Sequence, residues 1–478
     1  MTKLLSIFCG LLLFSGCGGG GNANSASTPL SPRTATHLVV TAPANATNGS
    51  IFSFTVTAVD ASNNMVSSYA GTVRFTSTDS QAVLPDNSTL TNGTATFSAT
   101  LKTAGNQTIT ATDTVTPSIT GTSSSIGVSG PTGSMLHTRE SHTATLLSDG
   151  KVLVAGGMHW AQGPEPVCFP NPGCFILSAL SSAEIFDPTT GTFAPTGSMS
   201  ATRVFHTATL LPNGKVLVAG GDDRYGTTFA TAEIFDPSTG TFTPTGNMLI
   251  ARSAHTATLL TNGKVLVAGG AGPTGNVLTA ELFDPTTGTF TPTGNMSVAR
   301  FFHTATLLSD GRVLVAGGDS LTATAELYDP ATGTFTPTGS MSVARSSHRA
   351  TLLKSGAVLL TGGASSNGTT VTAELFDAAT GTFSPTGSMS SPRQTHTATL
   401  LTDGKVLVTG GTDGNIDLAT AELFDPTKGT FTAAGNMETE RTEHTATLLL
   451  GGEVLITGGI NADNAKGLNS LASAELFP

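Results

Sequence analysis

The stretch Arg252-Ser-Ala-His-Thr-Ala-Thr-Leu-Leu-Thr-Asn-Gly-Lys-Val-Leu-Val-Ala-Gly-Gly270 decides the fold, because close copies of it occur seven times along the chain. Each copy reads as an apolar strand, a turn, a second apolar strand and a Gly-Gly pair. The turn is Asn-Gly or Asp-Gly in most copies, and these dipeptides predict two-residue type I′ hairpins with positive φ at both central positions. Seven hairpins of one kind predict seven units of one architecture.

A complete unit adds two more strands after a variable loop. These strands are Ala-Glu-Leu-Phe-Asp-Pro and Gly-Thr-Phe-Thr-Pro-Thr-Gly-x-Met, separated by a second turn. The repeated pattern resembles the kelch repeat, whose four-stranded units form the blades of β-propellers, including the central domain of galactose oxidase. The resemblance covers 131–478 and implies an all-β, seven-bladed propeller. The family's fourth-strand Trp is replaced here by Phe193, Phe242, Phe290, Phe335, Phe383 and Phe431.

The last unit lacks a fourth strand, because the chain stops at Ala474-Glu-Leu-Phe-Pro478. The segment Gly127–Met135 aligns with the fourth strand Gly288–Met296, with Ser129 in place of Phe290. We therefore expect a propeller domain over 127–478 that is closed by the N-terminal segment 127–135. Such a closure leaves no free sheet edge at the chain end.

Residues 37–126 lie outside the repeat and show the period of two that half-buried strands produce, most clearly in Ile51–Val59. This region predicts an immunoglobulin-like β-sandwich. It resembles bacterial immunoglobulin-like domains in the phrases "HLVVTAP", "FSFTVTAVDA" and "GTATFSATL", without the Cys and Trp landmarks of antibody domains. The resemblance implies a spacer or an adhesive module.

The N-terminus carries Lys3 and an apolar run, Leu4–Phe14, that is too short to span a bilayer. The following Phe14-Ser-Gly-Cys17 resembles a bacterial lipobox, which implies a signal peptide over 1–16, lipidation at Cys17 and a flexible tether over 17–36. The alternative is an ordinary secretory signal in which Cys17 is incidental. The expected location is outside the cytoplasm, lipid-anchored to the bacterial membrane, at the outer membrane or cell surface.

Outside the export signal, Cys168 and Cys174 are the remaining cysteines. A short loop closed by two cysteines in an exported protein predicts a disulfide rather than a metal site, which needs further ligands. The formal net charge of −11 and the pI near 5.3 provide no basic surface for nucleic acid. We expect a monomer whose partner is a protein or a carbohydrate at the cell surface.

The polar residues that recur in every unit favour a structural role. A residue needed equally by seven blades solves a problem that all blades share, such as satisfying backbone groups beside the Gly-Gly bend. The recurrent Glu is the natural partner of the recurrent Arg. In the reference unit this framework is Arg252, His255, Gly269, Gly270 and Glu281. Ligands spread around a wide ring do not converge on one ion, so no metal or cofactor is expected.

Specific binding is expected where the copies differ, in the pair between Arg and His and in the loops after Gly-Gly. In kelch-like propellers these regions surround the channel mouth on one face. Aromatic residues with nearby acids suit sugar or peptide binding. The candidate ligand-binding residues are His159, Trp160, Phe205, Asp222, Asp223, Tyr225, Phe302, Asp413 and Asp417. The alternative for Trp160 is that it only packs its own long loop.

The sequence favours a non-catalytic binding or scaffold lipoprotein. A copper radical oxidase would need two Tyr and two His on one copper, with one Tyr joined to a Cys, and of three Tyr in the chain only Tyr225 is well placed. No nucleophile elbow, phosphate-binding loop or paired acids can be identified. The alternative function is a sugar-processing enzyme on a kelch propeller, similar to the bacterial sialic acid mutarotase.

Overall fold

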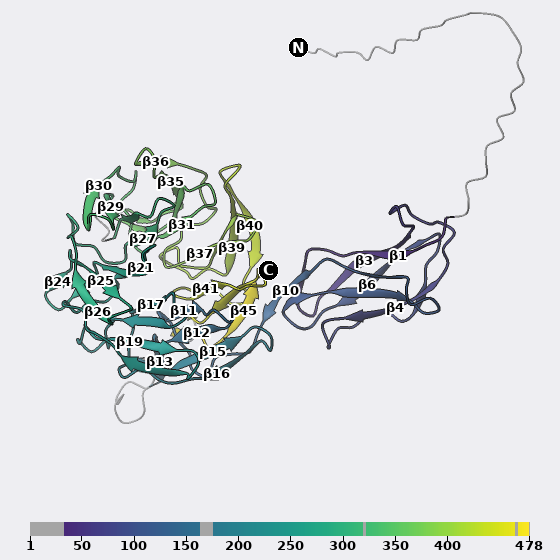
Figure 1. Cartoon of the computed structure of the whole chain (residues 1–478), viewed down its shortest axis with the longest axis horizontal. Helices are drawn as coiled ribbons and strands as arrows, with labels where there is room; N and C mark the ends of the chain where they lie inside the picture. The colour runs from purple at the N-terminus through teal and green to yellow at the C-terminus, as the bar shows by residue number, and fades with distance from the viewer. Residues whose placement is uncertain (1–32, 163–174, 319–321, 464–466, 478) are drawn as a thin grey trace, which may run out of the picture.

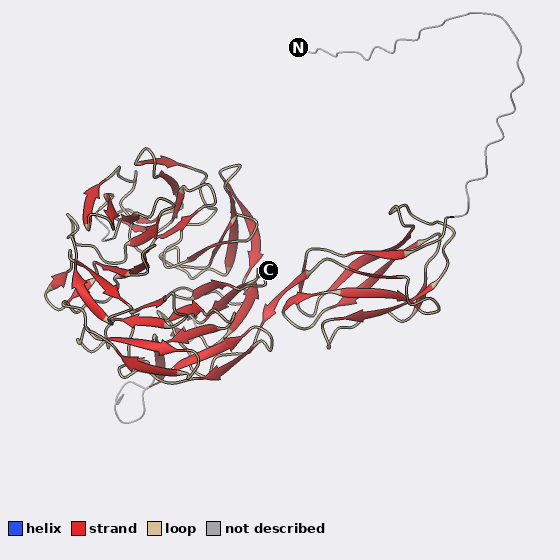
Figure 2. Ribbon diagram, viewed as in Figure 1, coloured by secondary structure: helices blue, strands red, loops and turns tan. Residues whose placement is uncertain are grey.

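The structure is a computed structural model that describes residues 33–162, 175–318, 322–463 and 467–477. All of its regular elements are strands, and the described ranges contain no helix (Figure 2). It follows that none of their segments crosses a membrane as a helix. The predicted all-β class is confirmed.

The N-terminal unit consists of two facing sheets. The first has the order β1 (His37–Thr41), β3 (Ile51–Val59), β6 (Thr94–Thr100), and the second β5 (Ser88–Thr89), β4 (Thr72–Ser77), β8 (Ile109–Asp113), β9 (Thr120–Thr122). Alternate residues of each strand point inward, so that Phe54, Val56 and Val73 are buried between the sheets. The rings of Phe54 and Phe75 meet edge to face at 5.5 Å.

The repeat region forms four-stranded antiparallel sheets, six of which keep their strands in sequence order. The first three sheets are β11 (Thr143–Leu146), β12 (Val152–Ala155), β15 (Ala183–Asp187), β16 (Thr192–Pro195); β17 (Thr207–Leu210), β18 (Val216–Ala219), β19 (Ala232–Asp236), β20 (Thr241–Pro244); and β21 (Thr256–Leu259), β22 (Val265–Ala268), β25 (Ala280–Asp284), β26 (Thr289–Pro292). The next three are β27 (Thr304–Leu307), β28 (Val313–Ala316), β29 (Ala325–Asp329), β30 (Thr334–Pro337); β31 (Arg349–Leu352), β32 (Val358–Thr361), β35 (Ala373–Asp377), β36 (Thr382–Pro385); and β37 (Thr397–Leu400), β38 (Val406–Thr409), β39 (Thr420–Asp425), β40 (Thr430–Asn436).

A further sheet combines the two ends of the repeat region. Its order is β41 (Thr445–Leu448), β42 (Val454–Thr457), β45 (Ala474–Phe477) and β10 (Ile126–Pro131). The first strands of all these sheets contact their neighbours around a closed ring, in which β11 touches both β17 and β41 (Figure 1). A hydrophobic core lies between each pair of adjacent sheets, so a single sheet cannot bury its apolar faces alone.

Strand β10 belongs to both parts of the chain. Its first half pairs with β2 (Asn45–Thr47) and β7 (Gly105–Gln107), and the side chains of Ile126 and Val128 lie in the core of the N-terminal unit. Its second half pairs with β45, where Gly130 lies opposite Leu476 and Pro131 opposite Glu475. The expected domain boundary between residues 126 and 127 therefore falls inside one continuous strand.

The hairpin turns differ from the predicted two-residue type I′ form. In the reference unit only Gly263 has positive φ, at +81°, and the loop between the paired Leu260 and Lys264 has three residues. This is a type I turn followed by a left-handed Gly. The preceding Asn262 is selected because its side-chain oxygen accepts a hydrogen bond from the Lys264 amide at 3.1 Å, not because it adopts positive φ.

Smaller hairpins extend from one face after the Gly-Gly pairs. They are β13 (Met158–Gln162) with β14 (Phe175–Ala179), β23 (Ala271–Gly272) with β24 (Gly275–Asn276), β33 (Ala364–Ser365) with β34 (Gly368–Thr369), and β43 (Ile460–Asp463) with β44 (Gly467–Ser470). Each lies beside the connection that enters the first strand of the same sheet, as the bridges Glu140 to Met158 and Ser253 to Ala271 show. The two variable regions of the repeat are therefore neighbours in space.

Candidate functional site: the channel mouth

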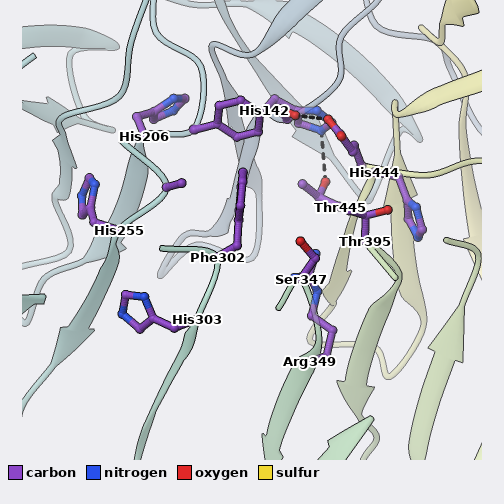
Figure 3. A pocket seen from close by; sticks show the side chains of 14 residues that line it. His142, His206, His255, Phe302, His303, Ser347, Arg349, Thr395, His444 and Thr445 are labelled. Atoms are coloured by element: carbon purple, nitrogen blue, oxygen red, sulfur yellow. Dashed lines mark hydrogen bonds between the residues drawn. The ribbon is translucent and has the colours of Figure 1, made fainter. Parts of the chain in front are cut away.

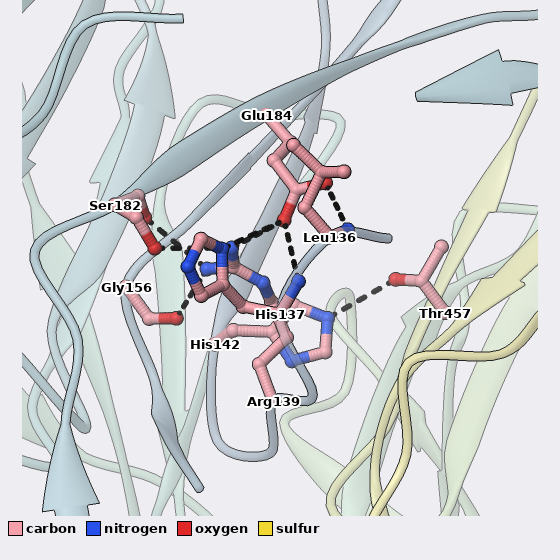
Figure 4. A network of polar contacts seen from close by, with 8 residues as sticks. All are labelled: Leu136, His137, Arg139, His142, Gly156, Ser182, Glu184 and Thr457. Carbon is pink, nitrogen blue, oxygen red and sulfur yellow. Dashed lines mark hydrogen bonds and ion pairs between the residues drawn. The ribbon is translucent and has the colours of Figure 1, made fainter. Parts of the chain in front are cut away.

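The recurrent Arg and Glu form a buried ion pair in every repeat sheet. In the first sheet, Arg139 Nη2 donates to Glu184 Oε1 at 2.7 Å, and Arg139 Nη1 donates to the Gly156 carbonyl at 2.8 Å (Figure 4). In the reference unit Arg252 Nη2 lies 2.8 Å from Glu281 Oε1, and both side chains are buried. Because the Arg also binds the carbonyl of the first Gly, the pair fixes the bend that ends the second strand.

The recurrent histidines form a buried ring in which each joins two adjacent sheets. His255 Nε2 lies 3.0 Å from the hydroxyl of Thr207, which is the first residue of the preceding sheet's first strand. The seven histidines are His142, His206, His255, His303, His348, His396 and His444. Burial lowers their pKa values, to about 3 for His206 and His303, so they are neutral at pH 7. The described residues contain no cluster of three or more metal-ligating side chains.

The residue immediately before each histidine adopts the left-handed conformation, with φ between +50° and +54°. These seven residues, called the mouth ring below, are Ser141, Phe205, Ala254, Phe302, Ser347, Thr395 and Glu443. Successive members are joined by six backbone hydrogen bonds of 2.9 to 3.2 Å, including Ala254 N–H to the Phe205 carbonyl. Positive φ is costly for residues with bulky side chains, so the surrounding sheets hold this conformation.

The mouth ring lines a pocket of about 390 Å³ (Figure 3). Five of the histidines also line it: His142, His206, His255, His303 and His444. Phe205 and Phe302 meet edge to face across it, with ring centroids 5.4 Å apart. Hydroxyl groups come from Ser141, Ser347 and Thr395. The pocket therefore combines aromatic surface with several hydroxyls in one concave space.

Two charged side chains also line this pocket, Arg349 and Glu443. Glu443 accepts a short hydrogen bond from the Ser141 hydroxyl. Arg349 is the first residue of β31, at the position where every other first strand has Thr. Each charge comes from one blade only, so the axial site is not symmetric.

The loops around the mouth are joined on one side into a continuous wall. The Ala462 amide donates to Asp417 Oδ2 at 2.7 Å, and the Trp160 amide donates to the Ser470 hydroxyl at 3.0 Å. The wall then continues to Tyr225, whose hydroxyl donates to the Leu177 carbonyl at 2.8 Å. These contacts connect the loops of the sheets that begin with β37, β41, β11 and β17.

Glu140 lies beneath this wall with 1% of its surface exposed, and neither carboxylate oxygen has a hydrogen bond of normal geometry. Burial raises the pKa of Glu140 to about 8, and the nearby Glu443 charge adds to the shift. The Trp160 side chain acts in the opposite direction, because its contact with the carboxyl favours the ionised form.

The structure divides the predicted ligand-binding residues into three groups. Phe205 and Phe302 line the axial pocket. His159, Trp160, Tyr225 and Asp417 belong to the wall, where burial raises the pKa of Asp417 and lowers that of His159. The remaining acids stabilise their own loops by accepting backbone amides: Asp222 from Arg224, Asp223 from Tyr225 and Thr227, and Asp413 from Asn415 and Ile416.

The lipidation residue Cys17 and the disulfide pair Cys168 and Cys174 lie outside the described residues. Two charged side chains that line the pocket, Arg349 and Glu443, were not among the predicted residues. Glu443 stands in the variable pair before His444, and Arg349 breaks the His-Thr dipeptide of the repeat, so both carried a readable signal.

Comparisons with known proteins agree with the repeat architecture. The family model of the kelch motif matches residues 204–249 and 395–438. Among solved structures, the chain is similar to a novel fungal alcohol oxidase with catalytic diversity among the AA5 family, in complex with copper. The sequence identity is 20%, the TM-score is 0.58, and the match covers 73% of this chain and 76% of that chain. No curated protein sequence matches the chain.

The side chains of this chain do not reproduce a site for a copper centre of the Tyr and His type. Tyr328 is fully buried and lies 2.9 Å from Thr293 Oγ1, and Tyr69 bonds to Asp113 in the N-terminal unit. Tyr225 is 70% exposed and lies on the wall. No tyrosine thus lines the axial pocket in the described part of the chain, and the similarity to the oxidase concerns the fold.

Proposed function

We propose that this kelch-repeat protein is a non-catalytic, lipid-anchored binding protein whose propeller-like head recognises a carbohydrate at the channel mouth. The finer architecture in this proposal is a seven-bladed propeller that follows an immunoglobulin-like domain. Two observations support it: the ring of seven sheets in the repeat region, each in contact with its two neighbours, and the two facing sheets of residues 37–126.

The axial pocket carries the proposal. A pyranose ring has an apolar face and polar edges, and the pocket offers Phe205 and Phe302 for the face and the hydroxyls of Ser141, Ser347 and Thr395 for the edges. The mouth ring is held by the backbone of neighbouring sheets, so a ligand meets a preformed site and loses little free energy to ordering it.

The alternative is a sugar-processing enzyme using the same pocket. The fold similarity to an alcohol oxidase and the raised pKa of Glu140 favour this candidate. Two features oppose it: Glu140 does not line the pocket, and neither do the tyrosines that copper oxidase chemistry requires. Turnover of a bound glycan to a new product, measured by mass spectrometry, would favour the enzyme over the binder.

The test is a glycan array probed with wild-type protein and with the double variant Phe205→Ser/Phe302→Ser. Ser already occupies the mouth ring at Ser141 and Ser347, so the variant keeps the local conformation. We expect the wild type to bind a defined glycan set with loss of at least tenfold in affinity in the variant, since the aromatic surface is removed. The control Leu450→Ser changes an exposed residue at the opposite end of β41 and should bind normally. Equal binding by all three proteins would place the glycan site elsewhere.

The lipid anchor at Cys17 is part of the proposal and has its own test. The full chain expressed in a bacterial host should fractionate with membranes, and Cys17→Ala should shift it to the soluble exported fraction. Wild-type protein found in the soluble exported fraction would favour the ordinary secretory signal, and membrane association that Cys17→Ala leaves unchanged would exclude Cys17 as the anchor.

A further inference from the structure

Arg349 stands at a position where the other six blades have a Thr with a structural role. There, a Thr at the start of the first strand bonds to the histidine of the next sheet, as Thr207 does with His255 at 3.0 Å. An Arg at this position cannot make that bond in the same way. His396 instead lies 2.9 Å from the buried hydroxyl of Thr361, which ends the second strand of the same blade as Arg349. Thr361 therefore provides the hydrogen bond to the histidine of the next sheet, and the side chain of Arg349 is available to contact a ligand in the pocket.

The guanidinium of Arg349 has little compensation within the protein. Its one hydrogen bond is a long one, from Nη1 to the His348 carbonyl at 3.5 Å. No carboxylate of the described residues lies within ion-pair distance of it, whereas the seven framework arginines each pair with a Glu. Burial lowers the pKa of Arg349, and only the charge of Glu443 opposes this shift. A part-buried cation without a partner is costly, and an anionic ligand would offset that cost.

This cation lies in the wall of the axial pocket. Arg349 lines the pocket together with Phe302 and Ser347, and Figure 3 shows the three side chains on adjacent segments. Burial lowers the pKa of His396 most, and the charge of Arg349 lowers it further. The same charge also lowers the pKa of His444. The guanidinium therefore lies near the histidines of the two following blades. Those histidines are neutral, which leaves Arg349 as the cation among the lining residues that the structure describes.

We infer that the carbohydrate recognised at the channel mouth is an acidic sugar, whose carboxylate pairs with Arg349 while its ring packs on Phe205 and Phe302. This inference rests on the proposed function and adds the charge of the ligand. The guanidinium presents two parallel N–H groups that match a carboxylate, a geometry that neither Thr nor Lys provides. Glu443, which precedes the first strand of the sheet two further along the ring, repels an anion and is held by Ser141, so it orients the carboxylate toward Arg349.

The experiment uses three sets of probes. The first is oligogalacturonides, the second is the same oligosaccharides after carboxyl reduction, and the third is a broad set of neutral glycans. Binding is measured by calorimetry with wild type, Arg349→Thr, Glu443→Gln and Arg312→Thr. Arg349→Thr restores the residue of the other six blades, so it should fold. Arg312→Thr removes the same charge at a distant turn, where Arg312 pairs with Asp310 at 2.6 Å.

The expected result is wild-type binding of the carboxylated probe, a loss of at least tenfold on carboxyl reduction, and a similar loss in Arg349→Thr. Glu443→Gln should bind the carboxylated probe severalfold more tightly, and Arg312→Thr should match the wild type. Equal binding of acidic and neutral sugars, or carboxylate binding that Arg349→Thr leaves unchanged, would overturn the inference while leaving the sugar-binding function intact. Binding of no glycan in any set would overturn both.

Discussion

Glu140 is the residue at which burial and charge conflict most directly. It stands in the variable pair between Arg139 and His142, where the equivalent residues are uncharged: Val204, Ser253, Phe301, Ser346, Gln394 and Thr442. Its carboxyl is almost fully buried, and its pKa is raised to about 8. A neutral side chain of the same shape would avoid the penalty that the ionised carboxylate incurs.

This conflict predicts a pH-dependent effect of Glu140→Gln. The folded-state pKa lies above the usual value of 4.5, so the unfolded chain releases the proton more readily and stability is lost as pH rises from about 4.5 to 8. Glu140→Gln should raise the free energy of unfolding by roughly 1–3 kcal/mol at pH 8 and change it little at pH 4.5. Urea unfolding at the two pH values measures this. Glu438→Gln, at an exposed position, is the control, and an equal gain at both pH values would contradict the explanation.

The lining of the pocket could be predicted from the sequence where a residue breaks the repeat visibly. Phe205 and Phe302 could be identified because the other copies vary at the same position. Arg349 could have been identified in the same way, but its meaning depends on the hydroxyl of Thr361, which lies twelve residues later and compensates for the missing Thr. The burial of Glu140 was not predictable from its neighbours in sequence, because loops from distant blades produce it.

At the scale of elements, the Gly-Gly bend determines how each second strand ends. In the reference unit a Cβ on Gly269 would lie 2.6 Å from the Arg300 carbonyl oxygen of the next blade and 2.7 Å from His303. Its φ is +66°, which glycine adopts without strain. The bend is therefore a contact between blades as well as a turn within one.

Gly269→Ala should destabilise the propeller-like unit more than Gly263→Ala in the same hairpin. Both glycines have positive φ, but the nearest atom to a Cβ on Gly263 is 3.6 Å away. We expect losses of roughly 2–3 kcal/mol for Gly269→Ala and roughly 1 kcal/mol for Gly263→Ala, because only the first adds a steric clash to the backbone strain. Denaturant unfolding of both variants provides the measurement, and similar losses would show that contact with the next blade is unimportant.

Element-level prediction was accurate for strands and inaccurate for turns. Alternation of apolar and polar residues located the strands of the N-terminal unit, and repeated apolar runs bounded by turns located those of the repeat. The Asn-Gly and Asp-Gly signals located the hairpins correctly but predicted the wrong turn type. The same dipeptides also serve the three-residue loop, in which Asn or Asp accepts an amide and only Gly is left-handed.

At the scale of the whole molecule, β10 connects the N-terminal unit to the sheet that contains the C-terminus. Beyond the strand pairing, the Thr132 amide donates to the Ala474 carbonyl at 3.0 Å and the Met135 amide to the Ala472 carbonyl at 2.9 Å. Met135 is 4% exposed and packs in the core between β12 and β42. The closure of the ring by 127–135 was predicted from the alignment of this segment with the fourth strands, and contacts of this kind are what such a closure requires.

Three chains test this closure: 33–478, 126–478 and 137–478. The second lacks most of the N-terminal unit but keeps β10, and the third lacks the closing segment as well. We expect the third to lose roughly 3 kcal/mol or more relative to the second, because Met135 leaves a cavity and β45 becomes an exposed edge. Calorimetry should show this as a lower melting temperature of the repeat region. Identical melting of the two shorter chains would exclude the proposed closure.

The overall fold could be predicted because a strict repeat presents the same evidence several times, so that chance patterns in one copy do not matter. The kelch motif and the propeller-like neighbour confirm that part. The position of the N-terminal unit was less predictable. Sequence reasoning assigned residue 126 to one domain and residue 127 to the next, whereas β10 pairs with both units through one strand.

The sharing of β10 also has a mechanical consequence. A pull applied to the N-terminal side of the chain reaches the repeat region along β10, in the direction of the strand. Its hydrogen bonds to β45 run perpendicular to that direction, so they carry the load together in shear rather than opening one after another. The strand through which tension enters also joins the two ends of the repeat region, so resistance to force and integrity of the ring depend on the same few residues.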